Sequence, residues 1–295
     1  MKLGYNTWSM PEMAFDEAAR WCAGLGFDSL EVTVSEGWPT DVLRLLPGAA
    51  REWRSLSDDL GIVITSLTAN APIIVTGGDW SASLDRLRRC LALAAELQSP
   101  NQRMPISLGA SWPREYGQTT TSIPESAWTQ YRTLIVDRFG ELARLARELG
   151  VRVALEPNVS TVVSRPEHAL YVIAAIDDDA LGINLDISHF AVQGDSIADI
   201  VRVLGPHALT SEVKDTVGVA PQFDFLVPGE GEFDFTGFVK GMKEVGFDGS
   251  IAVEISLRRQ RIELYDAKEA AAAAYAVLSE AFAAAGVDRH SLKEK

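Results

Sequence analysis

Short apolar runs alternate with longer amphipathic segments along almost the whole chain. Most of the short runs are apolar throughout, which is typical of parallel strands that are covered on both faces. They predict eight β-strands, at residues 2–7, 29–34, 62–69, 105–109, 151–156, 182–186, 208–214 and 250–255. Between the strands, apolar side chains recur at helical spacing. This spacing predicts α-helices at residues 12–24, 83–97, 126–149, 166–176, 197–204, 235–245 and 267–285.

A glycine between two apolar residues stands directly before several predicted strands, at Gly26, Gly61, Gly150 and Gly246. Glycine just past a helix end adopts the left-handed conformation that satisfies the last helical carbonyls. The pattern therefore predicts repeated βα units, whose crossovers are nearly always right-handed. Eight such units close into a single (β/α)8 TIM barrel of the α/β class, so we expect one domain over residues 1–295.

A doubly wound open sheet is the structural alternative. That fold binds a dinucleotide through a glycine-rich loop after its first strand, and residues 5–9 contain no glycine. On a barrel, two segments are longer than the scaffold needs, at about 111–124 and 216–234. Both follow predicted strands, so we expect them to be active-site loops at the C-terminal end of the barrel, acting as lids or substrate walls.

The composition is that of an ordinary globular protein, with 47% hydrophobic and 23% charged residues among 295, and it excludes collagen-like, coiled-coil and disordered classes. An excess of 41 acidic over 27 basic residues gives a formal net charge of −14. Because that field repels phosphate groups, we expect neither nucleic acid nor a membrane surface as a partner. The first residues lack the pattern of a signal peptide, and Cys22 and Cys90 match no zinc spacing. Both observations favour a cytoplasmic protein with two buried thiols.

Four successive predicted strands end in acidic side chains: Glu156, Asp186, Glu212 and Glu254. The strand ends of a barrel gather around its axis, so these carboxylates would converge. Each alone could be a solvated strand end or a helix cap, but four buried together need a counter-charge. Lys214 alone supplies too little charge. A hard divalent cation such as Mg²⁺ or Mn²⁺ is the usual partner of an oxygen-rich site.

Other side chains near the predicted strand ends are candidates for substrate contact. His189 follows Asp186 by three residues, where it could support a ligand, bind substrate or bind the metal. Aromatic rings could form a wall against a sugar face, although core packing explains them equally well. Arg258 could supply a positive group to the substrate, and the alternative is that it is a solvated loop residue. The candidate substrate-binding residues are His189, Trp112, Trp8, Lys214 and Arg258.

These residues and their neighbours resemble the xylose isomerase-like TIM barrel superfamily, and within it the sugar phosphate isomerase/epimerase branch. The matching segments follow the family's order through the C-terminal half of the chain: Leu155-Glu156-Pro157, Asn184-x-Asp186-x-x-His189, Val213-Lys214-Asp215, residues 228–235 and residues 246–254. The resemblance implies one divalent metal ion, Mn²⁺, Mg²⁺ or Co²⁺. Barrels of this family commonly form homo-oligomers, although the sequence does not decide the oligomeric state of this chain. It assigns Glu156, Asp186 and Glu254 as metal ligands. The epimerase branch has a histidine at the position of Glu212, so the site is either all-carboxylate, with Glu212 as the fourth ligand, or altered.

The resemblance implies a metal-dependent sugar isomerase/epimerase that works through an enediolate, with Glu156 and Glu254 as catalytic acid and base. The substrate-binding glutamate and arginine of the ketose 3-epimerases are Val162 and Gly218 here. A metal-dependent lyase or dehydratase acting on a keto-sugar, an inosose or a 3-keto-glycoside is therefore the alternative. A non-catalytic partner subunit that has lost the metal would also explain Glu212. An apurinic-site endonuclease is disfavoured by the small number of histidines, four, and by the negative charge.

Overall fold

Eight parallel strands form a closed barrel in the computed structural model, which describes residues 1–99, 102–111 and 123–289. Around the barrel the order is β1, β10, β7, β6, β5, β4, β3 and β2. The strands are β1 (Lys2–Asn6), β2 (Ser29–Thr33), β3 (Val63–Thr68), β4 (Pro105–Gly109), β5 (Arg152–Glu156), β6 (Leu181–Asp186), β7 (Ala208–Val213) and β10 (Ser250–Val253). The predicted TIM barrel is confirmed, and each predicted strand agrees with an observed one to within two residues at either end.

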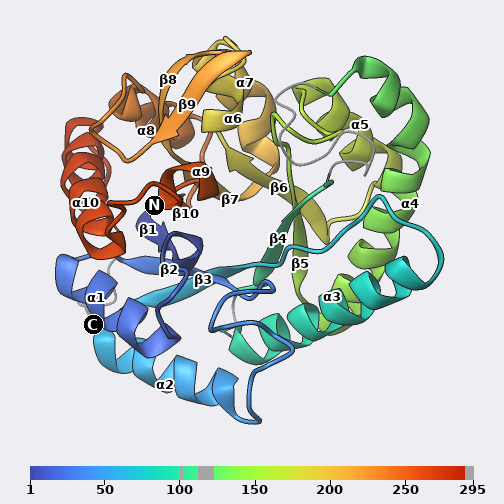
Figure 1. Cartoon of the computed structure of the whole chain (residues 1–295), viewed down its shortest axis with the longest axis horizontal. Helices are drawn as coiled ribbons and strands as arrows, with labels where there is room; N and C mark the ends of the chain where they lie inside the picture. Colours follow the sequence, from blue (N-terminus) through green and yellow to red (C-terminus); the bar gives the residue numbers. More distant parts are fainter. Residues whose placement is uncertain (100–101, 112–122, 290–295) are drawn as a thin grey trace.

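Helices surround the barrel as an outer ring (Figure 1). The longer ones are α1 (Phe15–Leu25), α2 (Ala49–Leu60), α3 (Gly77–Leu97), α4 (Glu125–Leu149), α5 (Pro166–Ile176), α7 (Ile197–Leu204), α8 (Phe235–Glu244) and α10 (Ala267–Ala284). Shorter ones are α6 (Ser188–Ala191), α9 (Leu257–Gln260), η1 (Thr7–Ser9) and η2 (Gly205–His207). The pattern did not predict α2, because its buried face consists only of Ala50, Trp53 and Ser57. That face is too short and too polar to produce a clear helical period.

The two faces of the strands differ more than the sequence suggested. In β2, Leu30 and Val32 alternate with Ser29, Glu31 and Thr33, and all five are buried. Hydrogen bonds inside the barrel, such as the one between Thr33 Oγ1 and the Asn6 side chain (3.0 Å), show that the polar set points toward the axis. The strands are therefore apolar toward the helices, where burial removes hydrocarbon from water, and in β2 and several others polar toward the axis.

The segment predicted as a loop at 216–234 contains an antiparallel hairpin of β8 (Asp215–Val219) and β9 (Gln222–Leu226). The hairpin packs against α6 and α9, and Figure 1 shows it as the orange ribbon above the strand ends. The strand pattern missed it because the alternation of Phe223, Asp224 and Phe225 is only three residues long. The expectation that this segment covers the C-terminal end of the barrel is in keeping with its position.

Asp215 holds the remainder of that segment in place. Its buried carboxylate accepts hydrogen bonds from the backbone N–H groups of Thr216, Gly229, Gly231 and Phe233, at 2.8 to 3.0 Å. A Cβ atom on Gly231 would lie 2.4 Å from Asp215 Oδ1, so glycine is needed there for close approach. The acidic, glycine-containing motif at 228–235 is thus explained by loop structure.

Two further expectations concern burial and membranes. Cys22 and Cys90 are free and buried, as predicted. Across the described ranges, no helix combines the length and the apolarity needed to cross a bilayer.

The two ends of the described chain meet at one edge of the barrel. The Asp28 carboxylate, just before β2, accepts from the backbone N–H of Leu3 at 2.9 Å and from Arg289 Nε and Nη2 at 2.8 and 2.9 Å. Asp28 is buried. A buried carboxylate that loses a charged donor is left with an uncompensated desolvation cost.

We therefore expect Arg289→Ala to lower the free energy of unfolding by about 1–3 kcal/mol in urea denaturation. The matched control is Arg202→Ala, which removes a pair with Asp199 in which the side chains are 70% and 65% exposed. That variant should cost less than about 0.5 kcal/mol, because exposed ion pairs contribute little. Equal losses in the two variants would contradict the proposed importance of the Asp28–Arg289 contact.

Candidate active site

Three side chains of types that bind metal ions converge at the ends of β5 and β6. His189 Nε2, on α6, lies 3.3 Å from Glu156 Oε1 and 3.4 Å from Asp186 Oδ2. One ligand atom from each of the three lies within 4.8 Å of the others. Two carboxylates and one imidazole are donors that suit a divalent cation. We call Glu156, Asp186 and His189 the ligand triad.

A buried ammonium group lies beside this triad. Lys214 directly follows β7 and is only 2% exposed. Its Nζ donates to Asp186 Oδ2 and lies 2.8 Å from Glu254 Oε1. Burial alone would lower the pKa of Lys214, but Asp186 and Glu254 outweigh it and raise the pKa well above its usual value. Lys214 is therefore charged at neutral pH.

Asp186 is the most constrained carboxylate of the site. It is fully buried, and burial would raise its pKa, but the charges of Lys214 and His189 outweigh that effect and lower the pKa below its usual value. Its Oδ1 accepts from the backbone N–H of Ser188 at 3.1 Å and from the Ser188 hydroxyl. Its Oδ2 accepts from Lys214. Both oxygens of this ionised carboxylate are thus already hydrogen-bonded.

Glu212, the predicted strand-seven ligand, is directed to other partners. Its Oε1 accepts from Asn6 Nδ2 at 2.5 Å, and its Oε2 accepts from Asn184 Nδ2 at 2.7 Å. Burial, together with the charges of Glu31 and Glu254, raises the pKa of Glu212 well above its usual value. The structure therefore groups Glu212 with two amides and leaves it outside the ligand triad, although metal binding by Glu212 stays a prediction.

Glu31 is an acidic residue of the barrel interior that the pattern of strand ends did not predict. It is fully buried on β2. Its Oε1 accepts from Thr68 Oγ1 at 3.2 Å, and its Oε2 has no hydrogen-bond partner among the described residues. Burial, followed by the charges of Glu254 and Glu156, raises the pKa of Glu31 to about 8. The signal that could have found it is the two-residue polar alternation of Ser29, Glu31 and Thr33.

Glu156 and Glu254 are more exposed than the other acidic residues of the barrel interior. Their side chains are 13% and 12% exposed, whereas that of Asp186 is completely buried. A substrate that enters from the C-terminal end of the barrel can therefore reach these two carboxylates. Burial raises the pKa of Glu254, although Lys214 partly opposes that shift. Acid–base exchange needs an accessible carboxyl whose pKa is moved toward neutral pH.

Phe225, on the β8–β9 hairpin, covers one side of the site. Its ring lies 5.0 Å from the His189 ring, edge to face, and 5.8 Å from Lys214 Nζ. This contact could not be predicted from the sequence, because it requires the hairpin to fold back over the ends of β6 and β7. Phe225 therefore places an apolar ring beside His189 and Lys214, whereas the expected aromatic wall consisted of other residues.

The described contacts of the remaining candidates are with residues outside the triad. Trp8 stacks on Trp38 at 4.0 Å between ring centroids. Arg258 pairs with Asp224 of the hairpin at 3.0 Å, and both side chains are more than half exposed. Trp112 lies outside the described residues. Substrate binding by these three stays a prediction.

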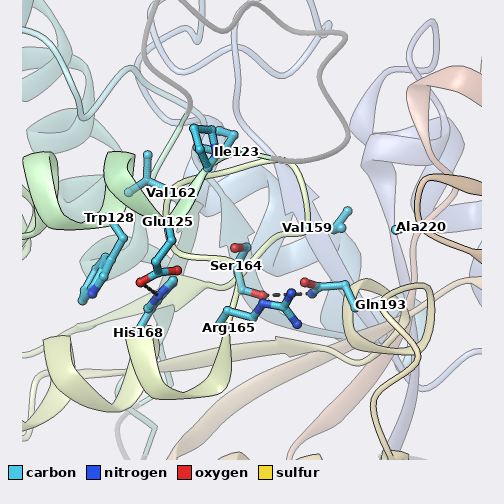
Figure 2. Close-up of a pocket in the computed structure, with 11 residues that line it drawn as sticks. Ile123, Glu125, Trp128, Val159, Val162, Ser164, Arg165, His168, Gln193 and Ala220 are labelled. Carbon is cyan, nitrogen blue, oxygen red and sulfur yellow. Dashed lines mark hydrogen bonds and ion pairs between the residues drawn. The ribbon is translucent and has the colours of Figure 1, made fainter.

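A separate pocket of about 280 Å³ lies next to α6, between the start of α4 and the loop after β5 (Figure 2). His168 stacks on Trp128 at 4.3 Å on one side of it, and its Nε2 lies 3.2 Å from Glu125 Oε1. Gln193 Nε2 donates to the backbone carbonyls of both Ser164 and His189 at 2.9 Å. Gln193 therefore connects the wall of this pocket to the helix that positions His189.

Comparison with known proteins gives a family match over most of the chain. A family model described as a xylose isomerase-like TIM barrel matches residues 19–281. Inosose isomerase of Bacillus subtilis (strain 168) is 29% identical over 126 residues, which are 41% of this chain and 45% of that protein. The match thus spans less than half the length of this relative.

Two solved structures have the same fold. A xylose isomerase-like TIM barrel protein from Mycobacterium smegmatis, in complex with magnesium, superposes with a TM-score of 0.72 at 18% identity, covering 96% of this chain and 97% of the other. The 3-keto-D-glucoside 4-epimerase of E. coli gives a TM-score of 0.74 at 20% identity, covering 95% and 99%. At these identities the likeness concerns the fold.

The raised pKa of Glu31 predicts a pH dependence of stability. The unfolded chain has a glutamate pKa near 4.5, and the folded protein a value of about 8. Between these values the folded state binds the extra proton, so the contribution of Glu31 to stability falls as pH rises. Glu31→Gln removes this loss. We therefore expect the unfolding free energy of the variant, relative to that of the unaltered protein, to rise by up to about 1.4 kcal/mol per pH unit between pH 5 and 8 in urea denaturation.

The control for this measurement is Glu52→Gln, on the exposed face of α2. It should leave the pH dependence of the unfolding free energy unchanged. If the difference in unfolding free energy between the unaltered protein and Glu31→Gln is constant across this pH range, then the surroundings of Glu31 do not raise its pKa as described.

Proposed function

We propose that this chain, which belongs to the xylose isomerase-like TIM barrel family, is a sugar isomerase or epimerase. The observation that carries the proposal is the pair of partly exposed carboxylates, Glu156 and Glu254, on either side of a buried, charged centre. Such a pair can remove a proton from a carbon atom and return it elsewhere. The names of the Bacillus subtilis relative and of the E. coli neighbour support the same class of reaction.

The ligand triad fits a divalent metal ion in its donor chemistry. Glu156, Asp186 and His189 would hold it, since their ligand atoms already converge and Asp186 is held ionised by its neighbours. A bound divalent ion supplies a Lewis acid that polarises the substrate carbonyl and stabilises negative charge on its oxygen. Magnesium in the Mycobacterium smegmatis structure supports a hard cation, although the triad's imidazole also suits softer metals.

The residues of the chain would divide the proton transfer between them. Lys214 lies at Glu254 Oε1 and so orients that carboxyl, which leaves Oε2 to exchange a proton with the carbon next to the substrate carbonyl. Glu156 would exchange the second proton from the opposite side. Phe225 would exclude water from the reacting atoms beside His189. Delivery of a proton to the other face of the same carbon gives epimerisation. Delivery to the former carbonyl carbon, with transfer of the neighbouring hydroxyl proton to the former carbonyl oxygen, gives isomerisation.

The proton transfer can be tested by NMR in D₂O with inososes, ketoses and 3-keto-glucosides as substrates. We expect one of these classes to incorporate solvent deuterium at the carbon next to its carbonyl. Glu156→Gln and Glu254→Gln should each slow this exchange by about 10²–10⁴-fold, because each removes one acid–base group. Glu244→Gln, at the exposed end of α8, is the control and should exchange at the unaltered rate.

The same spectra identify the product. An inverted centre or a moved carbonyl supports the proposal, whereas loss of a neighbouring hydroxyl or glycosyl group would assign a dehydratase or lyase in its place. Exchange that persists at the full rate in both glutamine variants would remove Glu156 and Glu254 from the mechanism.

Metal binding is tested by calorimetric titration of the chelator-treated protein with Mn²⁺. We expect one site, lost in Asp186→Asn and in His189→Ala because each removes a member of the triad. Glu212→Gln should keep the affinity within about threefold, since Glu212 is held by Asn6 and Asn184. Circular dichroism establishes that each variant is folded. Loss of binding in Glu212→Gln would instead restore the four-carboxylate site suggested by the strand ends.

A further inference from the structure

Lys214 and a divalent ion at the triad would require the same oxygen atom. Lys214 Nζ donates to Asp186 Oδ2, and this is also the oxygen that faces His189 Nε2 across the triad. The other oxygen, Oδ1, is occupied by the backbone N–H and hydroxyl of Ser188. Asp186 is completely buried, so water cannot replace either partner. An ion bound by the triad must therefore share Oδ2 with the ammonium or take it over.

We propose that Lys214 is a built-in counter-cation that competes with the divalent ion for Asp186, so that metal loading requires Lys214 to release Asp186 Oδ2. This inference rests on the proposed metal site. Without the ion, the ammonium pairs with both Asp186 and Glu254 and keeps the two carboxylates in place. With the ion, the positive charge at Asp186 comes from the metal.

The second partner of Lys214 makes this exchange feasible. Nζ lies 2.8 Å from Glu254 Oε1 as well, so the ammonium keeps a carboxylate partner after it leaves Asp186. Lys214 also lies over the Phe225 ring, which gives the cation a further favourable contact. A buried ammonium without a partner would be unfavourable. In both the metal-free and the metal-bound state, Lys214 keeps a carboxylate partner.

Two cations that compete for one carboxylate lower each other's affinity. Replacement of Lys214 by methionine keeps the apolar stem and removes the charge. We expect Lys214→Met to bind Mn²⁺ at least tenfold more tightly than the unaltered protein in calorimetric titration. The control is Lys240→Met on the exposed face of α8, which should bind like the unaltered protein.

Thermal unfolding provides a second measurement, which also covers a variant that is poorly folded without metal. Lys214→Met removes the ammonium that pairs with Asp186 and Glu254, so its melting temperature should fall in the presence of chelator. Saturating Mn²⁺ should then raise that temperature by more than it raises the melting temperature of the unaltered protein. This larger gain is the signature of an ion that replaces the lysine.

The possible failures can be told apart. Equal or weaker Mn²⁺ binding by Lys214→Met, with unaltered protein that binds well, would overturn the competition and leave the metal site intact. It would mean that Lys214 pre-organises the ligands. If neither protein binds Mn²⁺ and neither gains thermal stability from it, the competition and the proposed metal site both fail. Binding by Lys214→Met alone supports the competition in its strongest form.

Discussion

The contact of Lys214 with Asp186 and Glu254 is the interaction on which the interior of this barrel depends. Acidic residues from β2, β5, β6 and β7 and from the end of β10 point toward the axis, and among the described residues one buried lysine faces them. Charge burial on this scale is unfavourable unless each group is paired, hydrogen-bonded or neutralised. The structure uses all three solutions. Asp186 is paired, Glu212 is bonded to two amides, and Glu31 has a pKa raised to about 8.

These solutions are arranged by depth. Asn6, Asn184 and Glu212 form a buried hydrogen-bonded layer that links β1, β6 and β7. Glu156 and Glu254 lie above it with partial exposure. The deeper layer fixes the strand ends, because an amide that bonds a carboxylate across the barrel tolerates little displacement. The accessible pair can then exchange partners without disturbing the fold.

The sequence predicted the barrel well because its signals are local. Apolar runs, helical spacing and the glycines before the strands each depend on a few neighbouring residues. It also predicted that the carboxylates of Glu156, Asp186, Glu212 and Glu254 would converge, since strand ends share one edge. The structure places His189 beside Glu156 and Asp186, and Lys214 beside Asp186 and Glu254. The partners of Glu212 could not be predicted. Asn6 is 206 positions away in the chain, and its contact depends on the side-chain conformations of both residues.

Other features were not predicted, because their sequence patterns are too short or because they do not lie at strand ends. The hairpin over the site depends on a three-residue alternation that periodicity cannot separate from a loop. Glu31 was not predicted because it lies within a strand, whereas the predicted site residues lie at strand ends. A sequence also cannot show which oxygen of Asp186 receives Lys214. That choice, which decides how a metal ion would bind, is a matter of atomic geometry.

The pairing of β1 with β10 has a consequence for biosynthesis. β1 is translated before the other strands of the barrel, yet one of its two neighbours in the sheet is the last of these strands to be made. Strands that are far apart in the chain pair slowly during folding, and an unpaired strand edge is prone to association with other chains. Asn6 lies on β1, so the amide that holds Glu212 cannot be fixed until translation of the barrel is nearly complete. The candidate active site is thus assembled in the same event that closes the barrel.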